Sequence, residues 1–410
     1  MRYVIVGDSF AATSAIEGIR SRDQQGEIIV INKENEKAYY RPLISYVLYG
    51  KSKIENIYQR DDKFYEDNKV QLMLGVEALS MDPVEKTLTL DNGKVLEYDK
   101  ILISTGSRPF VPPMAGLDKV RYKYNFMTIA DMKKLEKAVK PTSRVLIIGS
   151  GLIGLKAAEG LLHRSKSITV VDLADRILPS ILDKGAGEIV KSQLEEAGIT
   201  FELCTSADHF EENKAYLQNG KVIDFDILLL CVGVRANVSL VKDAGGQVDR
   251  GIIVNQKLET TLPDVYAAGD CTQGFELTTK TNRVIAIIPN ANLQGHTAGV
   301  NMAGGDASFN NPIAMNAIGF FGSHIVTAGV YEGEEETFRD EKGYKKFYTK
   351  NGKLTGFILL GDYIDRAGIY TALIRNETEL ADIDWNMLKE KPLLAAFALT
   401  RRKEMLAREV

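Results

Sequence analysis

Cysteine is scarce in this sequence. The chain has 410 residues and only three cysteines, Cys204, Cys231 and Cys271, which are too far apart to form a Cys-x-x-Cys pair. This spacing excludes a disulfide framework and a thiolate metal site, and it fits a cytoplasmic location, where thiols stay reduced. The four histidines show no metal-ligand spacing either, so we expect no metal.

Long apolar runs and an excess of positive charge are also missing. The longest apolar stretches, such as 227–234, are far shorter than the roughly 20 residues that span a membrane. Lys and Arg number 51 against 55 Asp and Glu, which gives a net charge of −4 and excludes a nucleic-acid binder that works through a strongly basic surface. At roughly 100 to 200 residues per domain, the length predicts two to four domains.

One stretch carries the full fingerprint of a dinucleotide-binding turn. A strand-like run at 145–148 leads into Gly149-x-Gly151-x-x-Gly154, then a helical stretch and a second strand that ends at Asp172. The glycines let the backbone approach a pyrophosphate, the helix N-terminus supplies partial positive charge, and the acid can bind the two ribose hydroxyls. The alternative is a tight turn that binds no ligand.

A second stretch follows the same order with changed residues. The strand-like run 3–6 leads to Gly7, and a helix and another strand follow. Ser9 replaces the middle glycine, Ala12 replaces the last one, and Asn32 stands where an acid would bind ribose. This copy of the fingerprint is the weaker of the two.

The repetition extends to two further buried-strand runs. Residues 98–109 and 225–237 each contain an apolar run that ends at a glycine, Gly106 after Thr105 in the first and Gly233 in the second. Self-similarity on this scale indicates two nucleotide-binding units built on one plan, so one chain should bind two dinucleotides. The expected fold is α/β, with two Rossmann-like domains and a smaller C-terminal α+β domain.

These motifs together resemble the two-dinucleotide flavoproteins, the pyridine nucleotide-disulfide oxidoreductases in the wide sense, over about residues 1–310. Residues 261–270, which end in Gly269-Asp270, resemble the second FAD motif of that family. Three finer features are similar to the branch of NADH:rubredoxin reductases, the nitrite reductase FAD domain and the flavin reductases that accompany carbon monoxide dehydrogenase. They are Tyr39-Tyr40-Arg41-Pro42, the segment 233–237 and the segment 289–304.

The resemblance implies FAD and NADH as cofactors and suggests which residues bind them. The helix that begins near Asn290 would point its N-terminus at the flavin pyrimidine ring, where it stabilises the anionic reduced flavin. The alternative for Arg41 is a surface salt bridge, and the alternative for Asn290 is a helix cap. The expected FAD residues are Gly7, Ser9, Ala12, Asn32, Arg41, Pro42, Thr105, Gly106, Asp270 and Asn290; the expected NADH residues are Gly149, Gly151, Gly154, Asp172 and Gly233.

By the same resemblance the FAD domain is split. It would comprise residues 1–113 and 245–315, with the NAD domain at 114–244 between them and an interface domain at 316–410. The last part shows a strand-like run at 318–330, a hairpin around Asn351-Gly352 and a helical tail from Asp384. In relatives this part covers the flavin side and often makes the dimer, so a homodimer is expected.

The expected path of the electrons follows from an absence. The disulfide-reducing branches carry a cysteine soon after the first nucleotide unit, and here the stretch 41–49 has none. Cys271 directly follows Asp270, but a small buried residue is the commoner role for a free cysteine. We therefore expect electrons to pass from NADH through flavin directly to a rubredoxin or a ferredoxin, in a reaction that can also run in reverse. The alternatives are an NADH oxidase that makes peroxide, and a non-catalytic flavin-binding subunit that senses redox state.

A second departure concerns charge beside the flavin. Many relatives place a Lys shortly after the Arg-Pro pair and a Glu two residues after the last fingerprint glycine; this chain has Tyr46 and Lys156 there. Our hypothesis is that Lys156 is the catalytic cation, near flavin N5 and the nicotinamide carboxamide. The alternative is that Lys156 points to solvent and pairs with Glu159 on the same helix.

The choice of nucleotide depends on Asp172. Its charge would repel the 2′-phosphate of NADPH, so NADH is expected. Arg176 lies close enough in sequence to accommodate that phosphate, although its commoner role would be to pair with Asp172 or Asp175.

Overall fold

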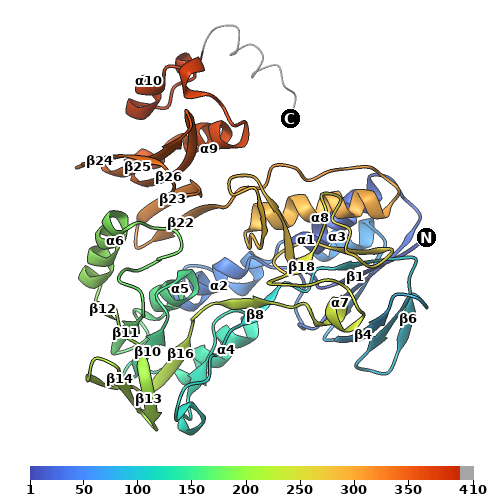
Figure 1. Ribbon diagram of the computed structural model, residues 1–410. Coiled ribbons are helices and arrows are strands. Elements are labelled where there is room, and N and C mark those ends of the chain that lie inside the picture. Colours follow the sequence, from blue (N-terminus) through green and yellow to red (C-terminus); the bar gives the residue numbers. More distant parts are fainter. Residues whose placement is uncertain (398–410) are drawn as a thin grey trace. The chain divides into compact units, whose positions relative to one another are not determined.

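The computed structural model describes residues 1–397, and these form two compact units (Figure 1). The first unit comprises Met1–Phe275 and Asn282–Asn310, and the second comprises Glu276–Thr281 and the chain from Asn311 onwards.

The first unit is built on two five-stranded parallel sheets. Their central strands, such as Arg2–Val6 and Arg144–Ile148, are continuous runs rich in Val, Ile and Leu, which is typical of parallel strands buried on both faces. The first sheet has the order β19-β7-β1-β2-β3, with bounds Val265–Ala267, Lys100–Ile103, Arg2–Val6, Glu27–Asn32 and Val70–Leu74. The second has the order β12-β11-β10-β16-β9, with bounds Ile199–Glu202, Ser167–Val171, Arg144–Ile148, Ile227–Leu230 and Lys123–Tyr124.

The two sheets repeat one design, as the sequence predicted. Val6 pairs with Ile31 and Ile103, as Ile148 pairs with Val171 and Leu230. Each half also carries a three-stranded antiparallel sheet. These are β4-β5-β6 (Ala78–Asp82, Thr87–Leu90, Val95–Glu97) and β13-β14-β15 (Ala207–Glu211, Lys214–Leu217, Val222–Asp224).

Helices α1 (Phe10–Arg20) and α8 (Ile288–Met302) lie near the two ends of the first unit's sequence and pack side by side in space (Figure 1). Small residues let their backbones approach closely. A Cβ at Gly295 would lie 2.1 Å from the carbonyl oxygen of Ala11, and one at Gly299 would lie 2.2 Å from that of Ala15. This contact places the start of α8 beside the first glycine turn.

The other helices of this unit connect and cover the sheets. They are α2 (Ile44–Tyr49), α3 (Asp62–Asp67), α4 (Ile129–Ala138), α5 (Leu152–Leu161), α6 (Lys184–Glu196) and α7 (Ser239–Asp243). Two short strands, β8 (Ser107–Pro109) and β17 (Val234–Ala236), pair where the chain passes from one sheet to the other and back. Two more small strands, β18 (Ile252–Ile253) and β21 (Thr281–Arg283), flank β20 (Thr272–Glu276).

The second unit contains an antiparallel sheet followed by helices α9 (Ala367–Arg375) and α10 (Trp385–Glu390). The run 318–330 is not one strand but part of a hairpin, because the chain turns at Phe321-Gly322, where both residues have positive φ. The hairpin around Asn351-Gly352 is present. The sheet order is β22-β23-β26-β25-β24, with bounds Met315–Phe320, Ser323–Gly329, Lys353–Gly361, Gly343–Lys350 and Glu334–Asp340.

Of the helical tail predicted from Asp384, α10 is present, and the part from residue 398 lies outside the described residues. No helix within residues 1–397 is both long enough and apolar enough to span a membrane. The fold class predicted from the sequence is confirmed. The boundaries 113/114, 244/245 and 315/316 remain predictions.

Candidate functional site

The two glycine turns at the carboxyl ends of β1 and β10 are fixed by backbone geometry. Gly7 and Gly149 have φ of +104° and +111°, a region that favours glycine. A Cβ at Gly7 would lie 2.3 Å from the carbonyl oxygen of Ser104, and one at Gly149 would lie 2.3 Å from that of Cys231. A Cβ at Gly154 would lie 2.1 Å from the carbonyl oxygen of Gly149. These three glycines are required by the fold itself.

Gly151 has a different role, because its own surroundings leave room for a side chain. A Cβ there would meet no atom within 4 Å, although the residue is the N-cap of α5. The open space therefore lies in front of the amide groups of a helix N-terminus, which suits a pyrophosphate. Gly106 and Gly233 have positive φ and equally open surroundings. Ser9, the N-cap of α1, makes no side-chain capping bond, and Ala12 is fully buried.

Asp172 sits at the end of β11 and is tied to the second turn. Its Oδ2 accepts hydrogen bonds from Ser150 N at 2.6 Å and Ser150 Oγ at 2.8 Å, and its Oδ1 accepts one from Ala174 N at 2.8 Å. A carboxylate has about four acceptor sites, so capacity remains for a ribose hydroxyl. Asn32 occupies the equivalent place in the first copy, and its Nδ2 donates to the carbonyl oxygen of Glu36 at 2.8 Å.

Asp8 is a buried carboxyl that was not predicted as a site residue from the sequence. It follows Gly7 as Ser150 follows Gly149, so the two copies have exchanged the position of their acid. Its Oδ2 accepts from Ala38 N at 3.0 Å and from the Tyr65 hydroxyl at 2.8 Å. Its Oδ1 is buried with no hydrogen-bond partner among the described residues. Burial raises the pKa of Asp8 to about 6. The sequence signal that could have identified Asp8 is an acidic residue inside a glycine turn.

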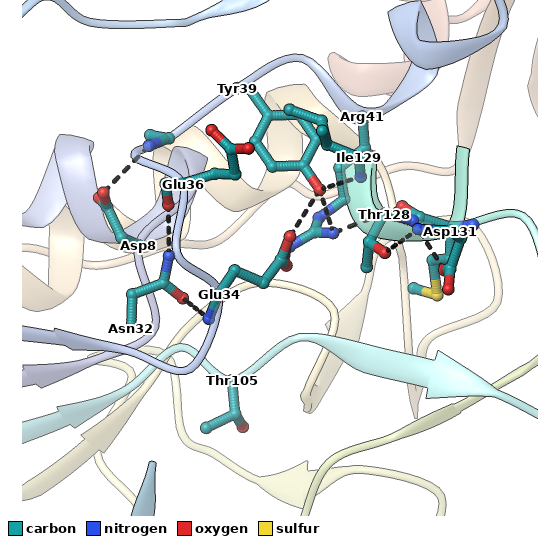
Figure 2. Close-up of polar contacts among 12 residues, drawn as sticks. Asp8, Asn32, Glu34, Glu36, Tyr39, Arg41, Thr105, Thr128, Ile129 and Asp131 are labelled. Atoms are coloured by element: carbon teal, nitrogen blue, oxygen red, sulfur yellow. Dashed lines mark hydrogen bonds and ion pairs between the residues drawn. The ribbon is translucent and has the colours of Figure 1, made fainter. Parts of the chain in front are cut away.

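Arg41 belongs to a cluster that joins the Arg-Pro segment to the start of α4 (Figure 2). Its guanidinium forms an ion pair with Glu34 and donates to the Tyr39 hydroxyl at 2.9 Å. The Tyr39 hydroxyl donates to Glu34 Oε2 at 2.7 Å and accepts from Ile129 N at 3.2 Å. The salt bridge considered for Arg41 therefore exists, but the arginine is only partly exposed. Pro42 follows it in a short 3-10 turn.

Asp270 follows the glycine turn after β19, and α8 braces that turn. None of the described residues donates a hydrogen bond to the Asp270 carboxylate. Burial raises its pKa, and the nearby Arg41 opposes that effect. Gln294 of α8 accepts from Gly269 N at 2.8 Å. Asn290 is buried and donates to the carbonyl oxygen of Ile285 at 3.1 Å, so its amide holds the segment before the helix.

Lys156 contacts Tyr46, the other residue considered for the charge beside the flavin. Its ammonium group lies 2.7 Å from Glu159 Oε2 and 4.8 Å from the centre of the Tyr46 ring. The Lys156 side chain is 15% exposed, so it pairs with Glu159 without extending into solvent. A second lysine, Lys51, lies 3.9 Å from Glu159 and 5.7 Å from the same ring centre. Tyr46 thus faces two cations.

Cys271 is completely buried beside Asp270. Its thiol contacts the carbonyl oxygens of Ile103 and Ala268 at 3.3 and 3.4 Å. Burial raises the pKa of the Cys271 thiol to about 11. Since thiolates are the reactive species, this environment favours a structural role.

Arg176 is held away from Asp172. Its Nη1 lies 2.6 Å from Asp175 Oδ1, and its Nε donates to the carbonyl oxygen of Leu182 at 3.0 Å. Within residues 1–397, no group of three or more His, Cys, Asp or Glu side chains is placed to bind a metal.

Comparison with known proteins identifies the family. Residues 1–295 match the family described as pyridine nucleotide-disulphide oxidoreductase. The chain is 31% identical to the epsilon subunit of NADH-dependent phenylglyoxylate dehydrogenase from Aromatoleum evansii, over 93% of each chain. It is 28% identical to NADH-rubredoxin oxidoreductase from Clostridium acetobutylicum, over 82% of this chain and 85% of that one.

A solved structure shares the whole fold. In the covalent putidaredoxin reductase–putidaredoxin complex, the matched chain has a TM-score of 0.87 and 21% identity, and the match covers 100% of this chain and 99% of that one. The resemblance seen in the sequence is confirmed, and so are FAD and NADH as the cofactors of an NADH-driven flavin oxidoreductase. The chain belongs to the pyridine nucleotide-disulphide oxidoreductases.

Proposed function

We propose that this flavoprotein oxidises NADH and delivers the electrons, without a redox-active cysteine, to a small iron or iron-sulfur carrier such as rubredoxin or ferredoxin, in a reversible reaction. The observation that carries the proposal is that no cysteine lies in the stretch after the first nucleotide unit, where the disulfide-reducing branches carry theirs. The stretch 41–49 contains no cysteine, and Cys271 is buried with a raised pKa. The similarity to an NADH-rubredoxin oxidoreductase supports this type of acceptor.

The two glycine turns are the proposed cofactor sites. FAD accepts a hydride from NADH and releases electrons one at a time, which matches a two-electron donor to a one-electron carrier. In our proposal the residues that hold FAD are Gly7, Ser9, Ala12, Asn32, Arg41, Pro42, Thr105, Gly106, Asp270 and Asn290. The residues that hold NADH are Gly149, Gly151, Gly154, Asp172 and Gly233.

Lys156 is the proposed catalytic residue. Glu159 and the Tyr46 ring restrain its ammonium group, so the charge has a defined position. A fixed cation beside the flavin would stabilise negative charge that develops there.

We also propose the split FAD domain (1–113 and 245–315), the NAD domain (114–244), and a homodimer formed through residues 316–410. The strands of the first sheet come from 2–103 and 265–267, and those of the second from 123–230, which supports this division. The three cysteines are free thiols, which supports a cytoplasmic location.

A second candidate is an electron-transfer subunit of a larger NADH-dependent dehydrogenase. The similarity to subunit epsilon of phenylglyoxylate dehydrogenase, over 93% of each chain, favours it. In that case the acceptor would be an iron-sulfur partner subunit instead of a free carrier.

Rapid mixing tests the proposal. The protein is reduced with one equivalent of NADH and mixed with oxidised rubredoxin, oxidised ferredoxin or air-saturated buffer. We expect fast reoxidation by at least one carrier and slow reoxidation by oxygen. Fast reoxidation by oxygen with stoichiometric peroxide would instead establish an NADH oxidase. Failure of NADH to bleach the flavin would leave only a non-catalytic subunit.

A further inference from the structure

The chain crosses between its two parallel sheets twice, and the two crossings are bonded to each other. Strand β7 leads into β8, and β16 leads into β17. β8 and β17 are antiparallel, with Arg108 opposite Arg235. The residues just before these strands include Gly106 and Gly233, which our proposal places at the FAD and NADH sites respectively. The crossings therefore connect the two sites over a short distance.

Asn237, directly after β17, makes four hydrogen bonds to the first crossing. Its backbone N donates to the carbonyl oxygen of Gly106 at 2.9 Å, and its carbonyl oxygen accepts from Thr105 Oγ1 at 2.9 Å. Its side chain adds two more bonds: Nδ2 donates to the carbonyl oxygen of Thr105 at 2.8 Å, and Oδ1 accepts from Arg108 Nη1 at 3.0 Å. Both polar backbone groups of Asn237 and both polar atoms of its side chain thus form hydrogen bonds across the junction.

A second contact keeps the same strands in register. Phe110 N donates to the carbonyl oxygen of Gly233 at 2.9 Å, and the Arg235 guanidinium lies 4.1 Å from the centre of the Phe110 ring. These contacts lie at the Val234–Pro109 end of the β8–β17 pair, opposite the end at which Asn237 lies. Asn237 is therefore the residue that closes the junction at Thr105-Gly106.

We infer that Asn237 is a positioning residue for hydride transfer, which acts by holding the Thr105-Gly106 segment of the FAD site in fixed register with the segment that contains Gly233 of the NADH site. Hydride transfer requires the reacting atoms to be aligned and about 3–3.5 Å apart, and a misplacement of about 1 Å can cost about a hundredfold in rate. The inference rests on the proposed assignment of the two sites.

Asn237→Ala tests it, because this variant keeps both backbone bonds and removes both side-chain bonds. Rapid mixing with increasing NADH gives the limiting rate of flavin reduction and the Kd of NADH separately. We expect the limiting rate to fall by about tenfold to a hundredfold, while the Kd values of NADH and FAD change by less than about twofold. The visible circular dichroism of the bound flavin should respond less to saturating NAD⁺ than in the wild type.

Asn219→Ala is the matched control, since the Asn219 side chain only closes a local turn with Lys221 N. It should leave the limiting rate and the dichroism unchanged. If Asn237→Ala purifies poorly, Asn237→Ser removes the same amide with less loss of volume. An unchanged limiting rate and an unchanged dichroic response would overturn the inference, as would a rate loss explained by weaker FAD binding. Failure of the wild type to be reduced by NADH would refute the proposed function instead.

Discussion

The ammonium group of Lys156 lies 4.8 Å from the centre of the Tyr46 ring, so the two residues that set the expected charge beside the flavin contact each other. A tyrosine face attracts a cation, and a buried carboxylate, Glu159, holds the same ammonium from another side. Tyr46 and Glu159 therefore hold the Lys156 ammonium group together.

Removal of the Lys156 charge is expected to slow flavin reduction. Lys156→Met should lower the limiting rate with NADH by about tenfold and make the flavin potential about 30 mV more negative, because a two-electron couple shifts by about 30 mV for 1.4 kcal/mol. Stopped-flow spectroscopy and equilibrium redox titration measure these two quantities.

The double variant Lys156→Met/Glu159→Gln distinguishes two causes of slower reduction: the loss of the Lys156 charge near the flavin, and the disruption caused by a Glu159 carboxylate that has lost its ion-pair partner. It neutralises both partners, so no carboxylate is left buried without this ammonium. We expect the same slow reduction in the single and the double variant. Full recovery in the double variant, or no loss in either, would contradict the catalytic role of Lys156.

Nucleotide preference is expected to depend on Asp172 and its neighbour. Leu173 is 68% exposed directly after Asp172, whereas Arg176 is paired with Asp175. Asp172→Ala/Leu173→Arg removes the charge that repels a 2′-phosphate and adds one that binds it, so the ratio of kcat/KM for NADPH over NADH should rise by about a hundredfold or more.

Steady-state kinetics with both nucleotides measure the switch. Asp172→Asn is the control, since its side-chain oxygen can still accept a hydrogen bond from Ser150. It should raise the ratio by a smaller factor. A double variant that still prefers NADH to the wild-type extent would show that Asp172 does not contact the adenosine ribose.

The repeated glycine turns were predictable from sequence because their chemistry is local: Gly7 and Gly149 need positive φ, and the strands around them are continuous apolar runs. The partners of Asn237 and Arg41 were not predictable. Asn237 meets Thr105 across 132 positions of sequence, and Arg41 reaches the first residue of α4, Ile129, through Tyr39. Such contacts depend on how the two halves pack, which a single sequence does not encode locally.

Asp8 is expected to give the fold a pH dependence. Its pKa is about 6 in the folded chain against 3.8 for an ordinary aspartate, so folding favours the protonated form. As pH rises from about 4 to 6, the unfolded chain loses this proton first, and the free energy of unfolding therefore falls. The loss is complete above about pH 7, at up to about 3 kcal/mol.

Asp8→Asn should remove this loss, because an amide can accept the hydrogen bonds of Ala38 and Tyr65 without a charge. Denaturant titrations of the holoprotein between pH 4 and pH 8 measure the effect. The variant should be more stable than the wild type at pH 8, with little difference at pH 4. Asp62→Asn, at an exposed carboxylate of α3, should leave the slope of the free energy of unfolding against pH unchanged. If the free energy of unfolding of Asp8→Asn falls with pH as steeply as that of the wild type, Asp8 is ionised in both the folded and the unfolded chain.

The close contact of α1 and α8 is expected to make Gly295 intolerant of any side chain. In Gly295→Ala the new methyl group would lie 2.1 Å from the Ala11 carbonyl oxygen, which is backbone and cannot rotate away. The helices must separate, at a cost of about 1–3 kcal/mol, and Tm should fall by several degrees. FAD affinity should weaken as well, because Ala11 lies in the first turn of α1 and Gln294 braces Gly269.

Gly368→Ala is the matched control: Gly368 is also helical, in α9, but a Cβ there meets no atom within 4 Å. It should raise stability by about 0.5–1 kcal/mol. Thermal unfolding and flavin fluorescence measure both variants, and equal effects at the two glycines would refute the proposed dependence of the FAD site on this helix contact.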